Sequence, residues 1–252
     1  MNMELTKMEG LGNTFVILQG PFSPMKQEII AMCKGYGQKP ADGLLVASSI
    51  DDRTVRMKYW NNDGSQAEMC GNGLRCLAKF AKLKGLIDAS SFTVETDAGP
   101  LKVKLKGGTD MVEAQIGKVR VAKSPIKLSE MEFLKANVGN PHAITFVDDI
   151  STAPVTTLGP IIEVDSHFPD KTNVEFVQIL DKNRVKLRTW ERGVGETLAC
   201  GTAMAATSAA LVEYVDGYYP ITVEVLGGKA KLWLDEDGYI RMLGPAKVVA
   251  EV

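Results

Sequence analysis

The sequence predicts an α+β fold of two similar, pseudo-symmetric domains, and two observations support this prediction. A strand-like alternation, a tryptophan, a polar loop and a cysteine occur twice in this order, in "TVRMKYWNNDGSQAEMCGNG" and "RVKLRTWERGVGETLACGTA". After each cysteine the apolar period changes from two residues to 3.6, which indicates a helix that follows strands. The two copies are offset by 130 residues, from Cys70 to Cys200, in a chain of 252 residues. A period this long indicates a duplicated domain rather than a solenoid.

The predicted elements follow the same order in both halves. Strands are expected at residues 54–60 and 184–190, and a helix begins after each cysteine, ending near Gly85 in the first half and near Gly217 in the second. The second helix is rich in small residues, which suits a helix buried against a curved sheet. Further short strands are expected at residues 93–96, 101–105, 111–115, 173–180, 221–226, 229–234 and 240–243. The expected domains are residues 1–118 with 246–252, which contain Cys70, and residues 119–245, which contain Cys200.

Composition excludes several classes of protein. Apolar residues make up 45% of the chain and charged residues 24%, as in ordinary globular proteins, and the net charge of -2 with no basic cluster disfavours a nucleic-acid partner. The N-terminal residues lack the apolar core of a signal peptide, and the longest apolar-leaning run is too short to span a bilayer. We therefore expect a cytoplasmic protein with reduced thiols and no membrane partner. The four cysteines have irregular spacing, which indicates neither a disulfide framework nor paired zinc knuckles.

The position of Cys70 and Cys200 at a helix start has chemical consequences. Backbone N–H groups and the positive end of the helix dipole stabilise a thiolate there, so we expect a lowered thiol pKa. The residues that follow each cysteine can offer N–H groups to a carboxylate. Inverting a stereocentre by proton transfer needs a base on one face and an acid on the other, and two thiols in opposite protonation states meet that need. Cys33 and Cys76 are interpreted as core residues, together with Met57, Trp60 and Trp190.

Five segments resemble, in order and spacing, the signatures of the diaminopimelate epimerases, which are pyridoxal-phosphate-independent amino-acid epimerases. These segments are "NNDGSQAEMCGNGLRC", "GNPHAI", "TNVEFV", "ERGVGETLACGTA" and "GPAKVV", and the resemblance covers nearly the whole chain. It implies two domains, each a barrel-like sheet around a central helix, with the active site in the cleft between them. It also implies that Cys70 and Cys200 are the acid and base, that the enzyme uses neither metal nor cofactor, and that a homodimer is common.

The resemblance also implies roles for individual side chains. The carboxylate at the reacting carbon is expected on the backbone N–H groups of the residues that follow the cysteines, and the distal amino-acid group on polar side chains. Asn13 is expected beside the reacting centre, and His142 and Glu191 are expected to support the two thiols. The carboxylate cradle comprises Gly71, Asn72, Gly201 and Thr202, and the distal group is expected to contact Asn61, Asn140, Asn173, Glu191 and Arg192. Arginine pairs with a carboxylate in a bidentate manner, and glutamate accepts from an ammonium.

The resemblance implies epimerisation of LL-2,6-diaminopimelate to the meso form, a step of lysine and peptidoglycan precursor synthesis. Alternatives to this function remain open at this point. Thr14 stands where the family usually has aspartate, and Lys39 and Pro40 interrupt a segment that is usually glycine-rich. These two departures leave the substrate open. A related two-cysteine racemase, of the proline or hydroxyproline type, is the nearest alternative. A redox-sensing or zinc-binding thiol module, using Cys70, Cys76 and His142, is a more distant one, because zinc sites prefer closely spaced ligand pairs.

Overall fold

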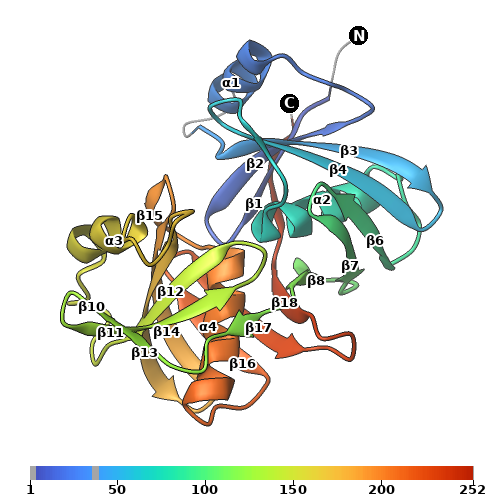
Figure 1. The fold of residues 1–252 in the computed structure, drawn as a ribbon. Helices are drawn as coiled ribbons and strands as arrows, with labels where there is room; N and C mark the ends of the chain where they lie inside the picture. The colour runs from blue at the N-terminus through green and yellow to red at the C-terminus, as the bar shows by residue number, and fades with distance from the viewer. Residues whose placement is uncertain (1–3, 36–39, 252) are drawn as a thin grey trace. The chain divides into compact units, whose positions relative to one another are not determined.

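The computed structural model describes residues 4–35 and 40–251 of the chain. The chain divides into two compact units, one formed by residues 1–115 and 243–252 and the other by residues 116–242. Both units mix curved, open sheets with a few helices, so the predicted α+β class is confirmed (Figure 1).

The first unit has a mixed sheet. It contains β1 (Thr6–Gly10), β2 (Asn13–Gln19), α1 (Lys26–Gly35), β3 (Gly43–Asp51), β4 (Thr54–Asn61), β5 (Gln66–Ala67), α2 (Gly71–Leu83), β6 (Ser91–Thr96), β7 (Gly99–Leu105) and β19 (Lys247–Glu251). Strand β2 pairs in parallel with β3 and β4 in parallel with β6, whereas β1–β2, β3–β4 and β6–β7 are antiparallel. Each parallel pair is joined by a helix, as a parallel crossover requires.

The second unit repeats this topology. It contains β9 (Arg120–Val121), β10 (Ile126–Leu128), β11 (Met131–Asn137), β12 (Pro141–Phe146), α3 (Val155–Glu163), β13 (Asn173–Asp181), β14 (Arg184–Glu191), β15 (Gly195–Thr197), α4 (Gly201–Tyr214), β16 (Ile221–Val225) and β17 (Gly228–Leu234). The β12–β13 and β14–β16 pairs are parallel, and β11–β12, β13–β14 and β16–β17 are antiparallel. Strands β8 (Met111–Gly117) and β18 (Ile240–Pro245) contain the points where the chain passes between units.

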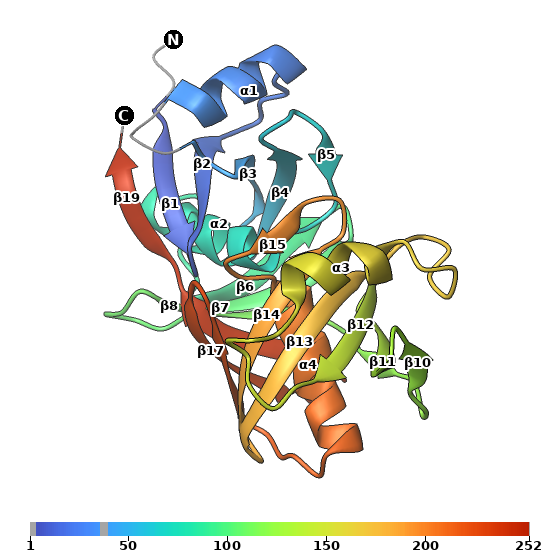
Figure 2. The ribbon, with the colours of Figure 1, turned by 90° about the vertical axis from the view of Figure 1, so that its left-hand side faces the viewer.

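In the first unit, α1 and α2 pack on opposite faces of the sheet (Figure 2). Alternate residues of a strand point to opposite faces, so β2 and β3 contribute to two cores. Val16 and Val46 join the cluster around α1, whereas Phe15 and Leu45 lie against the start of α2. A Cβ atom on Gly73 would lie 3.4 Å from both of these side chains, so the small residue lets the helix start approach the sheet closely.

In the second unit, α4 packs against β9, β11, β12, β13, β16 and β17, while α3 packs against β13, β14 and β15. Five buried alanines make α4 narrow, as the small-residue pattern predicts: Ala203, Ala205, Ala206, Ala209 and Ala210. The sequence analysis predicts no element at helices α1 and α3, which are found only in the structure. Glu163 at the end of α3 is buried and accepts hydrogen bonds from Trp190 Nε1 at 2.8 Å and from the Gly193 amide at 3.0 Å.

Candidate active site

Cys70 lies at the N-cap of α2, as the sequence predicts. Its backbone is extended, with φ -140° and ψ 122°, and its carbonyl accepts the first helical bond from the Leu74 amide at 2.7 Å. The next three residues, Gly71, Asn72 and Gly73, form the first turn and are buried. The amides of a first helical turn have no partner within their own helix. This turn therefore has the chemistry of an anion site beside a partly exposed thiol.

A buried hydrogen-bond network fixes the first turn of α2. Asn72 donates through Nδ2 to Asn13 Oδ1 at the start of β2, and its Oδ1 accepts from Arg75 Nη2 at 2.7 Å. Arg75 is fully buried and also donates to the Gly71 carbonyl at 3.2 Å and the Pro245 carbonyl at 3.4 Å. The structure thus brings together Asn13, Gly71 and Asn72, and Arg75 is the side chain that sets the orientation of the Asn72 amide.

Two segments that depart from the family pattern contact each other. The Thr14 amide donates to Asp42 Oδ2 at 2.7 Å, and its hydroxyl lies 3.5 Å from the Pro40 carbonyl. Lys39 lies outside the described residues. Asn61 closes β4, where its Oδ1 accepts from the Tyr59 hydroxyl at 2.8 Å and its Nδ2 donates to Ser65 Oγ at 3.0 Å. The structure therefore holds Asn61 within its own loop.

Cys200 lies at the N-cap of α4 and repeats the backbone geometry of Cys70. Its φ is -120° and its ψ is 119°, and its carbonyl accepts from the Met204 amide at 3.0 Å. Only 8% of the residue is exposed. Burial, and secondly the charge of Glu191, raise the pKa of the Cys200 thiol well above its ordinary value, against the hydrogen bonds of Thr202 and the Ala203 amide. The expectation of a lowered pKa is therefore wrong for Cys200, because desolvation outweighs the helix N-terminus.

Glu191 lies beside Cys200. Its carboxylate accepts from the Thr197 hydroxyl, and burial raises its pKa, while the hydrogen bonds of Thr197 and the Cys200 thiol oppose that shift. The carboxyl at the end of β14 is thus close enough to the sulfur to accept the thiol proton as a hydrogen bond. The expected pairing of Glu191 with a thiol corresponds to Cys200 within this unit.

His142 and Asn140 connect to the same thiol. His142 is fully buried, with Nδ1 2.8 Å from Glu175 Oε1 and Nε2 3.1 Å from Asn140 Oδ1. Asn140 Nδ2 donates to Thr202 Oγ1 at 3.3 Å, and that hydroxyl lies 3.4 Å from Cys200 Sγ. Three side chains that the sequence predicts, Cys200, Asn140 and His142, therefore belong to one hydrogen-bonded chain. The Thr202 hydroxyl connects Asn140 to the sulfur, and Glu175 ends the chain.

Asn173 and Arg192 form a separate contact. Asn173, at the start of β13, donates to the Pro141 carbonyl at 2.9 Å and accepts from the Arg192 amide at 3.0 Å. The Arg192 side chain is exposed, and its Nη1 donates to the Asp170 carbonyl at 2.8 Å. Arg192 is therefore positioned by its backbone and remains accessible to an anionic ligand.

Cys33 and Cys76 are buried in the core, as expected. Burial, with the charge of Asp42 second, raises the pKa of Cys33 to about 11. Burial raises the pKa of Cys76 to about 12 against the charge of Arg75. Both side chains are therefore neutral thiols over the physiological range, and neither has the properties of a nucleophile or base.

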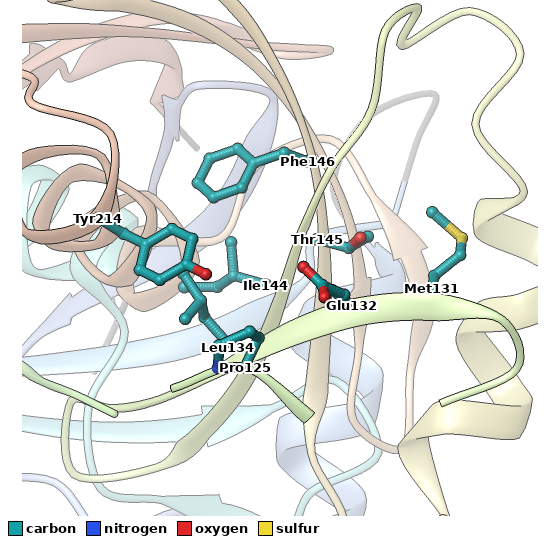
Figure 3. A pocket seen from close by; sticks show the side chains of 8 residues that line it. All are labelled: Pro125, Met131, Glu132, Leu134, Ile144, Thr145, Phe146 and Tyr214. Carbon is teal, nitrogen blue, oxygen red and sulfur yellow. The ribbon is translucent and has the colours of Figure 1, made fainter. Parts of the chain in front are cut away.

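One hollow of the second unit lies away from the sequence-predicted site residues. It has a volume of about 210 Å³ and is lined by side chains of β11, β12 and the end of α4, among them Leu134, Phe146 and Tyr214 (Figure 3). None of the sequence-predicted site residues contributes to its lining.

Within the described part of the chain, no group of three or more histidine, cysteine, aspartate or glutamate side chains could hold a metal ion. The helices of residues 4–35 and 40–251 include none long and apolar enough to cross a membrane.

Sequence reasoning missed two charged side chains of the site, Arg75 and Glu175. Both are fully buried, Arg75 in a helix whose buried residues are mostly apolar and Glu175 between Val174 and Phe176 in β13. A charge within a buried segment is rare unless it is paired, so the pattern itself contains a signal. The hydroxyl of Thr202 was also missed, because only its backbone amide was assigned a role.

Comparisons with known proteins point to the same family as the sequence motifs. The family model described as diaminopimelate epimerase matches residues 5–122 and 134–249. A diaminopimelate epimerase of Bacillus cereus is 36% identical over 97% of this chain and 94% of its own length, and one of Methanococcus maripaludis is 38% identical over 99% and 98%.

Solved structures share the fold at low identity. A Bacillus anthracis phenazine biosynthesis protein of the PhzF family has a TM-score of 0.76 at 17% identity and covers 99% of this chain and 98% of its own. A hydroxyproline epimerase from Agrobacterium vitis has a TM-score of 0.76 at 14% identity, with coverages of 99% and 91%. The sequence matches confirm the resemblance found in the motifs, and the chain belongs to the diaminopimelate epimerase family of isomerases.

Proposed function

We propose that this protein converts LL-2,6-diaminopimelate to meso-diaminopimelate by a two-base mechanism that uses Cys70 and Cys200. The observation that carries the proposal is the equivalent placement of the two cysteines in the duplicated units. Each is the N-cap of a buried helix, with extended backbone and a first turn of small or polar residues. The names of the sequence relatives supply the substrate.

The mechanism requires one thiolate and one thiol on opposite faces of the α-carbon. The thiolate removes the α-proton and the thiol delivers its own proton from the other face, so the configuration inverts and the two sulfurs exchange protonation states. The raised pKa of Cys200 favours its thiol form in the ligand-free unit. Glu191 accepts the thiol hydrogen bond, and His142 connects to the same sulfur through Asn140 and Thr202.

Substrate recognition is assigned to two groups of residues. The carboxylate next to the reacting carbon binds the first-turn amides of the two helices, contributed by Gly71, Asn72, Gly201 and Thr202, with Asn13 beside them. These amides stabilise the negative charge that develops as the α-proton leaves. The distal amino-acid group binds Asn61, Asn140, Asn173, Glu191 and Arg192, and the exposed fork of Arg192 suits a bidentate carboxylate contact.

The proposal includes neither metal nor organic cofactor, because two thiols suffice for proton abstraction and return. The substrate is a small amino acid made in lysine and peptidoglycan precursor synthesis, so the proposed location is the cytoplasm. A homodimer, which is common in the family, is proposed as the assembly.

The proposal is tested by proton NMR of LL-diaminopimelate with the native protein in deuterated water. The expected result is loss of an α-proton signal together with appearance of the meso isomer. Proline, hydroxyproline and simple monocarboxylic amino acids serve as competitors. Faster exchange of any of these would assign the enzyme another substrate, and the contact between Thr14 and Pro40 is the place where such a change of specificity would arise.

A further inference from the structure

Glu175 is a buried carboxylate whose presence needs a reason. It lies in β13 between Val174 and Phe176 and is 0% exposed. Its Oε1 lies 2.8 Å from His142 Nδ1, while among the described residues its Oε2 has no hydrogen-bond partner. Burying an ionisable group with one unsatisfied oxygen destabilises a fold, so the residue is a candidate for a role other than packing.

The contacts of His142 give the hydrogen-bonded chain a direction. Asn140 presents Oδ1 to His142 Nε2, so Nε2 must carry the proton and donate. The Nδ1–Oε1 contact then needs one proton of its own, which either Glu175 or His142 carries. At the other end the Asn140 amide donates to Thr202 Oγ1, so the single hydroxyl proton is available for Cys200 Sγ, 3.4 Å away. The thiol proton is directed to Glu191, which accepts it as a hydrogen bond.

The first unit shows that the fold does not need this pair. Phe15 occupies the position of His142, since both pair with the first residue of the following parallel strand, Gly43 in one unit and Asn173 in the other. Leu45 lies two residues after Gly43, as Glu175 lies two after Asn173. The same sites therefore hold an apolar pair beside Cys70 and an ionisable pair beside Cys200.

We propose that Glu175 is a positioning residue that, through His142 and Asn140, fixes the Thr202 hydroxyl as a hydrogen-bond donor to Cys200. The inference rests on the proposed function of Cys200 and deepens it. A donor held on the sulfur stabilises the thiolate that forms when Cys200 gives its proton to the substrate. The titratable groups that act on Cys200 are Glu191 and Glu175, and Glu175 is paired with His142. Glu175 and His142 are therefore replaced together, because the pair has no net charge whichever partner carries the shared proton.

The test replaces the pair by its counterpart from the first unit, in the double variant His142→Phe with Glu175→Leu. Two apolar side chains of similar size can replace a buried ion pair without loss of stability, so the variant should unfold at a denaturant concentration no lower than the native protein. We expect kcat to fall about tenfold or more with little change in KM. We also expect alkylation of Cys200 by iodoacetamide, followed by peptide mass spectrometry, to be about tenfold slower below its pH midpoint, since one hydrogen bond to a charged group is lost.

Two further variants separate the effect of hydrogen-bond direction along the Glu175–Thr202 chain from the effect of the charge of Glu175. Thr202→Val removes only the terminal hydroxyl and should reproduce the kinetic and alkylation effects even where the double variant folds poorly. Glu175→Gln can still donate to His142 Nδ1, so it should restore most of the activity that the double variant loses. The control is Glu113→Gln, a buried carboxylate of the other unit paired with Lys106 at 2.9 Å, which should leave kcat unchanged.

Native kcat and a native alkylation profile in the double variant, or in Thr202→Val, would overturn the proposal. A Glu175→Gln variant as impaired as the double variant would also overturn it, because charge rather than direction would then be essential. The alkylation measurement does not use diaminopimelate. Failure of the native protein to epimerise that substrate would therefore refute the proposed function while the pH profile of Cys200 still tests the role of Glu175.

Discussion

Replacing Arg75 by methionine should weaken both the fold and the first turn of α2. The guanidinium is fully buried and donates to Asn72 Oδ1 at 2.7 Å and to the Gly71 carbonyl at 3.2 Å. Hydrogen bonds to charged groups contribute about 1.5–3 kcal/mol each, and removing the buried cation recovers part of its desolvation cost. The expected net loss is about 2–4 kcal/mol in the free energy of unfolding.

The Arg75→Met variant should also lose activity. Without the guanidinium, the Asn72 amide is no longer oriented, and the proposed carboxylate cradle shifts, so kcat should fall about tenfold or more. Urea unfolding and steady-state kinetics measure the two effects. Lys79→Met is the matched control, because it removes from the same helix a cation that pairs with Asp110 near the surface, and it should cost less than about 1 kcal/mol. Equal stability and equal kcat in the two variants would refute the argument.

Two other outcomes are expected. Arg192→Lys should lower kcat/KM on diaminopimelate roughly tenfold to a hundredfold while barely affecting substrates without a distal carboxylate, because the bidentate fork is lost; an equal loss on both substrate types would contradict its assignment. The free energy of unfolding should decline above pH 9, because burial raises the pKa of Cys76 from 9.0 to about 12. The neutral thiol favours the folded state below pH 9, and this contribution is lost as the pH rises toward 12. The measurement is urea unfolding at several pH values under reducing conditions. In Cys76→Ala the free energy of unfolding should fall less steeply with pH above pH 9, by up to about 1.4 kcal/mol per pH unit, and an unchanged pH dependence would contradict the prediction.

The helices that follow the cysteines could be predicted because their signals are local. Leu74, Leu77 and Ala81 recur at helical spacing and are all buried in α2. Helix α3 gives the opposite signal, since Gly159 and Pro160 disfavour a helix interior. Tertiary packing explains the glycine: a Cβ atom at residue 159 would lie 2.7 Å from Trp190. Helix α1 buries only Ile29 and Cys33, too few positions to establish a helical period.

Site residues divide in the same way. Cys70 and Cys200 could be proposed as site residues because both lie where the spacing of apolar residues changes from that of a strand to that of a helix. This change is visible in the sequence alone, without knowledge of the fold. The partners of His142 could not, because Glu175 is 33 residues away and becomes its neighbour only when β12 and β13 pair in parallel. The pKa of Cys200 depends on burial within the folded unit, so the helix-start argument alone gives the wrong direction for it.

The two-thiol mechanism is tested most directly by Cys70→Ser and Cys200→Ser, each assayed for net epimerisation starting from LL- and from meso-diaminopimelate. A serine hydroxyl is a poor base at neutral pH, and each direction of the reaction uses both groups. Neither variant should produce net epimerisation in either direction, although each can still exchange the α-proton of the isomer that its remaining thiol faces. A variant that epimerises at the native rate would contradict the mechanism.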